Sequence, residues 1–193
     1  MSVAIIDCGG ANLRSVQHAL TLRDQEVVIT TDPAQISRAS HVVIPGVGSA
    51  GRVMNTLRRL NLTDTIRELR QPVLGICIGM QVLYEQSEEQ NTKCLGIFAG
   101  RVKKLPVNHG IKIPQMGWNE AAFNSSALSH LSNHYYFANS YYAEESRDTA
   151  AITEYEITMT SVAIKNNFIG CQFHPEKSSA AGEKFLNHFL ELK

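Results

Sequence analysis

The segment PVLGICIGMQ, residues 72–81, decides the fold. Its apolar first half, 72–76, predicts a buried strand, and a helical pattern over 78–86 follows directly. Between the two, Gly75-Ile-Cys77-Ile-Gly79 has the form glycine–x–nucleophile–x–glycine, which is typical of a sharp turn from a strand into a helix. Such a turn lifts the Cys77 thiol clear of the sheet and places it at a helix N-terminus, where the reactive thiolate is favoured. The plainer alternative is a buried strand cysteine that packs as a small hydrophobe.

The same alternation of apolar runs and helical spacing extends over the first half of the chain. The runs predict strands at 2–7, 26–30 and 41–44, and helical spacing appears around 13–20, 52–60 and 62–69. This order predicts an α/β fold with a mixed, mostly parallel sheet flanked by helices. The second half predicts short strands that add antiparallel members to the sheet, and a closing helix over 179–192. Those strands are expected at 102–105, 135–142, 150–153, 162–165 and 168–173.

Size and charge narrow the classes of function. The chain has 193 residues, of which 44% are hydrophobic and 19% charged, so we expect one globular domain over 1–193. Its 18 basic and 18 acidic residues balance, whereas a protein that tracks nucleic-acid phosphates normally carries a basic excess. No apolar run is long enough to cross a membrane, and the N-terminus lacks the basic start of a signal peptide. We therefore expect a cytoplasmic protein.

The metal-binding residue types show no spacing that indicates a metal site. The four cysteines are scattered, which argues against both a disulfide framework and zinc. His130 and His134 are four residues apart, but the residues around them indicate a loop and no acidic third ligand is near. We therefore expect no metal. The cysteines are Cys8, Cys77, Cys94 and Cys171.

A base and a group that orients it stand together in His174-Pro-Glu176, at the end of the predicted strand 168–173. The proline pushes His174 into an extended conformation, in which residues two apart point the same way. The Glu176 carboxylate can then hold one ring nitrogen of His174 while the other faces a nucleophile. The alternative is a loop histidine beside an acid that caps a helix.

The stretch 46–51, GVGSAG, matches G-x-G-x-x-G between a predicted strand and a predicted helix. That is the setting of a dinucleotide-binding loop, but the motif follows the third strand and the acidic residue expected about 20 positions later is missing. A simple tight turn is one alternative. A loop that offers backbone N–H groups to an anion is another.

Taken together, GICIG around Cys77 and HPE at 174–176 resemble the class I glutamine amidotransferases. Within that family, the chain is similar to the glutaminase subunits of imidazole glycerol phosphate synthase. The similarity rests on five motifs that occur in the family's order and cover the chain nearly end to end. They are DCGGANLRSV at 7–16, PGVG at 45–48, GICIGMQ at 75–81, PQMGWN at 114–119 and QFHPEKS at 172–178.

The resemblance implies a flavodoxin-like amidotransferase fold, no cofactor, L-glutamine as substrate, and ammonia delivered to a (β/α)₈-barrel cyclase subunit in histidine biosynthesis. It implies a catalytic triad of Cys77, His174 and Glu176, with oxyanion-hole N–H donors at Val47 and Ile78. Contacts to glutamine are expected from Gly46, Gly48, Gln81, Ser140 and Tyr141. Contacts to the cyclase are expected from Asn12, Trp118, Tyr136 and Lys177.

One position departs from the family pattern. The family usually reads F-x-H-S-Y where this chain has Phe137-Ala-Asn139-Ser-Tyr141. Asparagine keeps a donor and an acceptor but cannot carry charge. This change either alters the fine tuning of the glutamine pocket or indicates a paralogue that serves a different synthase. A dinucleotide-binding domain, in which Cys77 would be dispensable, and a non-catalytic module with the same fold are the remaining alternatives.

Overall fold

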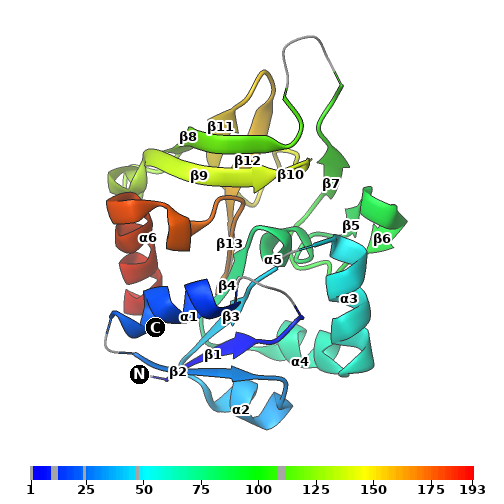
Figure 1. Ribbon diagram of the computed structural model, residues 1–193, viewed down its shortest axis with the longest axis vertical. Coiled ribbons are helices and arrows are strands. Elements are labelled where there is room, and N and C mark those ends of the chain that lie inside the picture. Colours follow the sequence, from blue (N-terminus) through cyan, green and yellow to red (C-terminus); the bar gives the residue numbers. More distant parts are fainter. Residues whose placement is uncertain (1, 10–12, 24, 47, 108–111) are drawn as a thin grey trace.

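A computed structural model describes residues 2–9, 13–23, 25–46, 48–107 and 112–193 (Figure 1). Its centre is a mixed sheet in the order β2-β1-β3-β4-β13-β12-β10-β7-β5-β6, with β11 beside β12, β8 beside β11, and β9 beside β8. The first five strands of that order are mutually parallel. They are β1 (Ser2–Ile6), β2 (Glu26–Thr30), β3 (His41–Ile44), β4 (Val73–Ile76) and β13 (Phe168–Cys171).

Helices cover both faces of the parallel strands, with α1 and α6 on one side and α3 and α4 on the other (Figure 1). Every residue of β3 and β4 is buried between these layers, as their uninterrupted apolar sequences require. The helices are α1 (Leu13–Thr21), α2 (Pro33–Arg38), α3 (Ala50–Arg59), α4 (Leu62–Glu68), α5 (Ile78–Gln81) and α6 (Ser179–Glu191). Within the part of the chain that the structure describes, no helix is both long enough and apolar enough to span a membrane.

The second half of the chain builds an antiparallel layer above the carboxyl ends of the parallel strands (Figure 1). It joins the parallel part where β12 pairs antiparallel with β13, and the one parallel pair within it is that of β5 with β7 among the described strands. Its strands are β5 (Gln86–Ser87), β6 (Thr92–Lys93), β7 (Arg101–Lys104), β8 (Gln115–Phe123), β9 (Asn133–Asn139), β10 (Tyr141–Ala143), β11 (Thr149–Glu154) and β12 (Thr158–Lys165). Three single turns of 3₁₀ helix complete the fold: η1 (Glu89–Asn91), η2 (Ser129–Leu131) and η3 (Pro175–Lys177).

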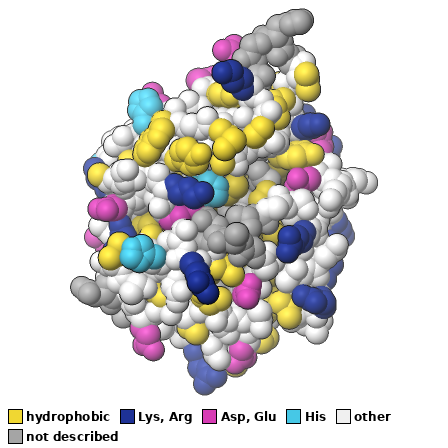
Figure 2. Space-filling view, viewed as in Figure 1, with side chains coloured by type: hydrophobic (Ala, Val, Ile, Leu, Met, Phe, Trp, Pro, Cys, Tyr) yellow, Lys and Arg dark blue, Asp and Glu magenta, His cyan; other side chains and the backbone are white. Residues whose placement is uncertain are grey.

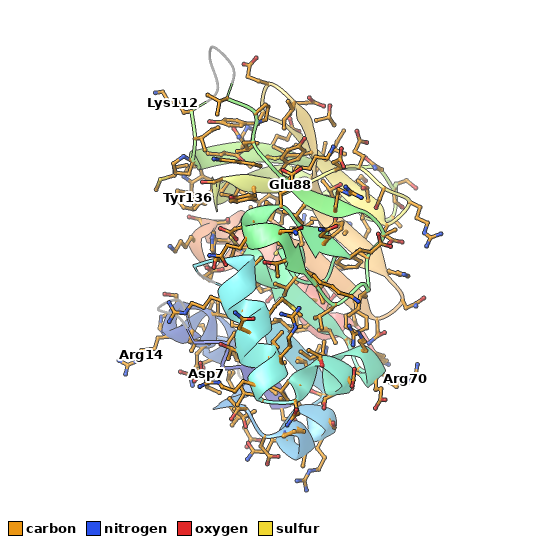
Figure 3. The ribbon with its side chains drawn as sticks, turned by 90° about the vertical axis from the view of Figure 1, so that its right-hand side faces the viewer. Asp7, Arg14, Arg70, Glu88, Lys112 and Tyr136 are labelled. Atoms are coloured by element: carbon orange, nitrogen blue, oxygen red, sulfur yellow. The ribbon has the colours of Figure 1, made fainter. Side chains whose placement is uncertain are left out.

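The loop after β5 is fixed to β7 by a side chain as well as by sheet pairing. The carboxylate of Glu88, just before η1, accepts a hydrogen bond of 2.9 Å from the backbone N–H of Lys104 at the end of β7. Figure 3 shows Glu88 between the two layers and Tyr136 on the outer face of β9. The predicted α/β class and the antiparallel extension of the sheet are therefore confirmed.

The helix predicted over 78–86 is much shorter than expected, since α5 ends at Gln81. The carbonyls of Val82, Leu83 and Tyr84 accept hydrogen bonds from the loop 95–98 instead of from a continuing helix. These contacts come from far along the chain, so the local pattern does not reveal them. A single helical turn also carries a smaller dipole than the long helix expected behind Cys77.

Three further elements differ from the predicted pattern. The strand predicted over 135–142 divides at Ser140, whose carbonyl accepts from Leu105, so that β9 and β10 pair with different strands. Strand β8 is not among the predicted strands, because apolar and polar residues do not alternate regularly along QMGWNEAAF and Gly117 interrupts the run. Helix α2 was also not predicted, although Asp32 caps it by accepting from the Ala34 N–H.

Candidate functional site

Cys77 occupies the turn between β4 and α5 with φ of 55° and ψ of −111°, a strained conformation for a residue with a side chain. Its backbone N–H donates to the Cys171 carbonyl at 2.8 Å, which ties the turn to the neighbouring strand β13. The turn needs glycine at position 79, because a Cβ there would overlap the carbonyl oxygen of Ile44 at the end of β3. The sharp turn predicted around Cys77 is present.

The loop after β3 lies against this turn. A Cβ on Gly46 would lie 2.5 Å from both the Gly79 nitrogen and the Ile78 Cβ, so only glycine allows the approach. Gly48 has φ of 95° and also lines the cavity in front of Cys77. Val47, the expected second oxyanion donor, lies outside the described residues. Gly46 and Gly48, the first two glycines of the G-x-G-x-x-G stretch, therefore lie at the cavity in front of the cysteine, as the hypothesis of an anion-binding loop requires.

His174 and Glu176 are placed as their spacing predicts. The His174 Nδ1 and the Glu176 Oε1 are 2.8 Å apart, and the two side chains are 6% and 0% exposed. Burial by itself lowers the pKa of His174, but hydrogen bonds to Cys77 and Glu176, and the negative charge of both, outweigh it and raise the pKa to about 10. Because Nδ1 is held by Glu176, Nε2 is the ring nitrogen left for Cys77.

The backbone around His174 is anchored from two sides. The His174 N–H donates to the Tyr136 carbonyl on β9 at 2.8 Å. The Ser178 hydroxyl donates to the His174 carbonyl at 2.7 Å and accepts from the Tyr136 N–H at 2.9 Å. These two sets of hydrogen bonds connect His174 to strand β9.

A cavity of about 540 Å³ opens in front of the cysteine and the histidine. It brings together most of the residues expected to act on glutamine: Gly46, Gly48, Cys77, Ile78, Gln81, Ser140, Tyr141 and His174. Glu176 is not among the residues that line the cavity; it lies behind His174, against the ring nitrogen Nδ1. Lys177, which the sequence analysis expects at the cyclase interface, also lines this cavity.

Sequence reasoning missed other lining residues, among them Ser15, Glu89 and Ala138. Glu89 supplies the only carboxylate among the described lining residues, and its Oε2 accepts from the Ala50 N–H at 2.7 Å. No motif singles out Glu89, which lies in η1 directly before Gln90 and Asn91, two residues with positive φ, and not on a regular element. Only the spatial approach of η1 to the start of α3 reveals it.

Buried side-chain amides form a network beside the cavity. The Gln81 Nε2 donates to the Tyr141 carbonyl at 3.1 Å and to the Gln172 Oε1 at 2.8 Å. The Asn139 Nδ2 donates to the same Tyr141 carbonyl at 3.1 Å. Gln81 Oε1 and Asn139 Oδ1 are buried and have no hydrogen-bond partner among the described residues. Both oxygens are shielded from solvent, so they lie within the wall of the cavity and not at its surface.

The residues expected to contact the cyclase lie on β8, β9 and η3. Trp118 and Tyr136 face each other across β8 and β9, with ring centroids 6.3 Å apart in an edge-to-face arrangement. Lys177 Nζ lies 6.0 Å from the centroid of the Tyr136 ring. Trp118 is 50% exposed and Met116 66%, and Figure 2 shows hydrophobic side chains gathered over β8 and β9. Asn12, the fourth expected residue, lies outside the described residues.

The structure gives no support for a metal site at His130 and His134, the pair of histidines four residues apart. The ring of His130 packs edge-to-face on His188, with centroids 5.7 Å apart. In the part of the chain that the structure describes, no three residues of the ligating types come together as a metal site would require. All four cysteines are free and buried.

Comparisons with known proteins agree with one another. The profile of the family "Glutamine amidotransferase class-I" matches residues 4–192. The "Imidazole glycerol phosphate synthase subunit HisH" of Bacteroides fragilis is 44% identical, with 100% of both chains covered. The protein of the same name from Buchnera aphidicola is 39% identical, again over 100% of both chains. A solved structure titled "Crystal structure of glutamine amidotransferase" superposes with a TM-score of 0.78 at 17% identity, covering 98% of this chain and 97% of the other.

Proposed function

Since the chain belongs to the class-I glutamine amidotransferases, we propose that it hydrolyses the side-chain amide of glutamine as the glutaminase subunit of imidazole glycerol phosphate synthase. The observation that carries the proposal is the meeting of Cys77, on its strained turn, with the buried His174–Glu176 pair at one cavity. A nucleophile, a base and a group that orients the base are the parts that acyl transfer requires.

In the first step the Cys77 thiol passes its proton to His174, and the thiolate sulfur attacks the side-chain amide carbon of glutamine. The carbonyl oxygen becomes an oxyanion, which needs backbone N–H donors placed in advance. Ile78, the first residue of α5, supplies one, and Val47 is our proposal for the second. The amide C–N bond then breaks, His174 gives its proton to the departing nitrogen, and ammonia leaves a γ-glutamyl thioester on Cys77.

In the second step neutral His174 takes a proton from water, whose oxygen attacks the thioester carbon. The C–S bond breaks and glutamate leaves with the water oxygen in its new carboxylate. Glu176 holds the Nδ1 proton throughout, so that Nε2 always faces the reaction. The raised pKa of His174 supports its role as an acid, because the ring stays protonated until ammonia has to be released.

The charges of the cavity wall suit the ends of free glutamine. The α-ammonium group of glutamine binds the Glu89 carboxylate, which is the one acidic group among the described lining residues. Gln81 lines the same pocket and fixes its wall, because its Nε2 donates to the Tyr141 carbonyl at 3.1 Å. The backbone at Ser140 and Tyr141, together with Gly46 and Gly48, closes the rest of the pocket.

We propose that the ammonia passes to a (β/α)₈-barrel cyclase subunit. The exposed apolar side chains of Met116 and Trp118, with Tyr136 beside them, form a surface that fits a protein partner. This surface is tied by the Tyr136 backbone to His174, so a partner bound there lies next to the site where ammonia forms. The free thiols fit a reducing cytoplasm as the compartment.

Release of glutamate from glutamine, measured with and without the candidate cyclase, tests the proposal. The wild-type chain should release glutamate when the cyclase and its ligand are present, and Cys77→Ser should not. Arg70→Ser, an exposed substitution far from the cavity, is the control. Activity retained in Cys77→Ser would refute the assigned nucleophile. Activation by another synthase in place of this cyclase would instead support the paralogue that Asn139 suggests.

A further inference from the structure

Gln172 is a fully buried polar side chain whose place in the mechanism has not been assigned. The register of β4 and β13 sets Cys171 beside Ile76, so the next residues along, Gln172 and Cys77, also lie side by side. The Gln172 N–H donates to the Ser161 carbonyl at 2.9 Å, which holds the backbone in place. The side chain is 0% exposed, and its Nε2 lies 3.7 Å from the Cys77 sulfur.

The hydrogen-bond chain fixes which end of the Gln172 amide faces the sulfur. The Tyr141 carbonyl can only accept, so the group of Gln81 that faces it must be the NH₂. The same Gln81 NH₂ lies 2.8 Å from the Gln172 amide, which must therefore present its oxygen to Gln81. The Gln172 NH₂ is left pointing at Cys77. Turning the amide round would set two donors against each other at Gln81.

A donor in this position distinguishes the two protonation states of the sulfur. An N–H group stabilises a thiolate more than a neutral thiol, and it does so most where water is excluded. The carbonyl of Ala138, 4.0 Å from the sulfur, is by contrast an acceptor that suits the thiol. Because α5 is a single turn, the helix behind the cysteine supplies little of the stabilisation that the sequence suggested.

We propose that Gln172 is a positioning residue of the glutaminase reaction, whose amide N–H holds the Cys77 thiolate ready beside His174. The proposal rests on the proposed function of Cys77 as nucleophile. It adds a link between nucleophile and pocket, because the amide that faces the sulfur is oriented by Gln81, which lines the glutamine cavity.

The test measures the rate of Cys77 alkylation by iodoacetamide against pH on the full chain, with the modified peptide identified by mass spectrometry. Gln172→Met removes the donor and the acceptor at nearly constant size. Gln172→Glu keeps the acceptor for Gln81 but sets a carboxylate against the sulfur. Gln115→Met, at a second fully buried glutamine, is the matched control. Thermal melting reports whether each variant folds.

We expect the pH midpoint of alkylation to rise by about one unit in Gln172→Met, which is about a tenfold slower reaction below the midpoint. The rise should be larger in Gln172→Glu, and Gln115→Met should match the wild type. If Gln172→Glu kept the wild-type profile while only Gln172→Met changed, Gln172 would merely anchor Gln81 and the proposal would be wrong. Should Gln172→Met not fold, the profile of Gln172→Glu alone decides.

Alkylation needs no glutamine turnover, so this result stands apart from the proposed function. A Cys77→Ala variant that still hydrolysed glutamine would overturn the nucleophile assignment whatever the alkylation profiles were. An unchanged profile in both Gln172 variants, with turnover abolished in Cys77→Ala, would overturn only the role of Gln172.

Discussion

Replacing Glu176 by glutamine isolates the contribution of one buried charge to the acid–base step. The substitution keeps the size of the side chain and an oxygen that can face the His174 Nδ1, now 2.8 Å from the Glu176 Oε1. It removes the negative charge that favours the imidazolium. Because the Glu176 side chain is 0% exposed, solvent does little to screen that charge.

The size of the effect follows from the pKa of His174, which rises from 6.5 to about 10. One pH unit is worth about 1.4 kcal/mol, so the imidazolium is stabilised by about 5 kcal/mol relative to an exposed histidine. Cys77 and Glu176 share this stabilisation. Losing one of the two should lower the pKa of His174 by about two units and slow glutamine turnover by roughly 10²-fold.

Turnover is measured as glutamate release with the cyclase present, across a pH series, for Glu176→Gln, His174→Ala and the wild type. A raised pKa keeps the His174 ring protonated to higher pH. The alkaline fall in wild-type turnover should therefore come near pH 10 and move to lower pH in Glu176→Gln. An NMR titration of the ring protons gives the pKa directly. Glu183→Gln, an exposed carboxylate on α6, is the control for charge alone.

His174→Ala should cost more than Glu176→Gln, because it removes the group that carries the proton, whereas Glu176 only orients and stabilises that group. An equal or reversed ranking would contradict these roles. So would an unchanged pKa of His174 in the Glu176→Gln variant.

The remaining predictions concern the nucleophile, its turn, the pocket and the partner. Cys77→Ala should abolish turnover with the fold intact, and a glutamine-based electrophile should label Cys77 alone; comparable labelling of another cysteine would refute the assignment. Gly79→Ala should destabilise the chain by about 1–3 kcal/mol in urea unfolding and impair turnover, because its Cβ overlaps Ile44; a variant with wild-type stability would contradict the packing argument. Glu89→Gln should raise KM roughly tenfold with little change in kcat, if the carboxylate binds the α-ammonium group; an unchanged KM would remove that role. The lone chain should be roughly 10²–10³-fold less active than the complex with cyclase ligand bound, as expected if one oxyanion donor is missing until the partner binds; full activity alone would refute this gating.

Local rules account for the parts of the site that the sequence predicts. A glycine two residues after Cys77 permits the close approach to β3, and proline after His174 sets the extended backbone that brings Glu176 behind the ring. Both effects act within a few residues. The β–α order likewise follows from apolar runs and helical spacing, which are local properties of the chain.

Contacts between segments far apart in the sequence set the features that local rules do not predict: the length of α5, the position of Glu89 and the surroundings of the Cys77 sulfur. The length of α5 depends on hydrogen bonds from 95–98, and the approach of Glu89 to the cavity depends on where η1 meets the start of α3. Gln172 reaches the Cys77 sulfur only because two parallel strands pair in one register, and a slip of a single residue would turn its amide to the opposite face. Local sequence rules therefore predict the proposed nucleophile Cys77, its proposed base His174 and the backbone geometry around both. The environment of the sulfur was decided by the tertiary structure, since pairing partners and register are settled by the packing of the whole chain.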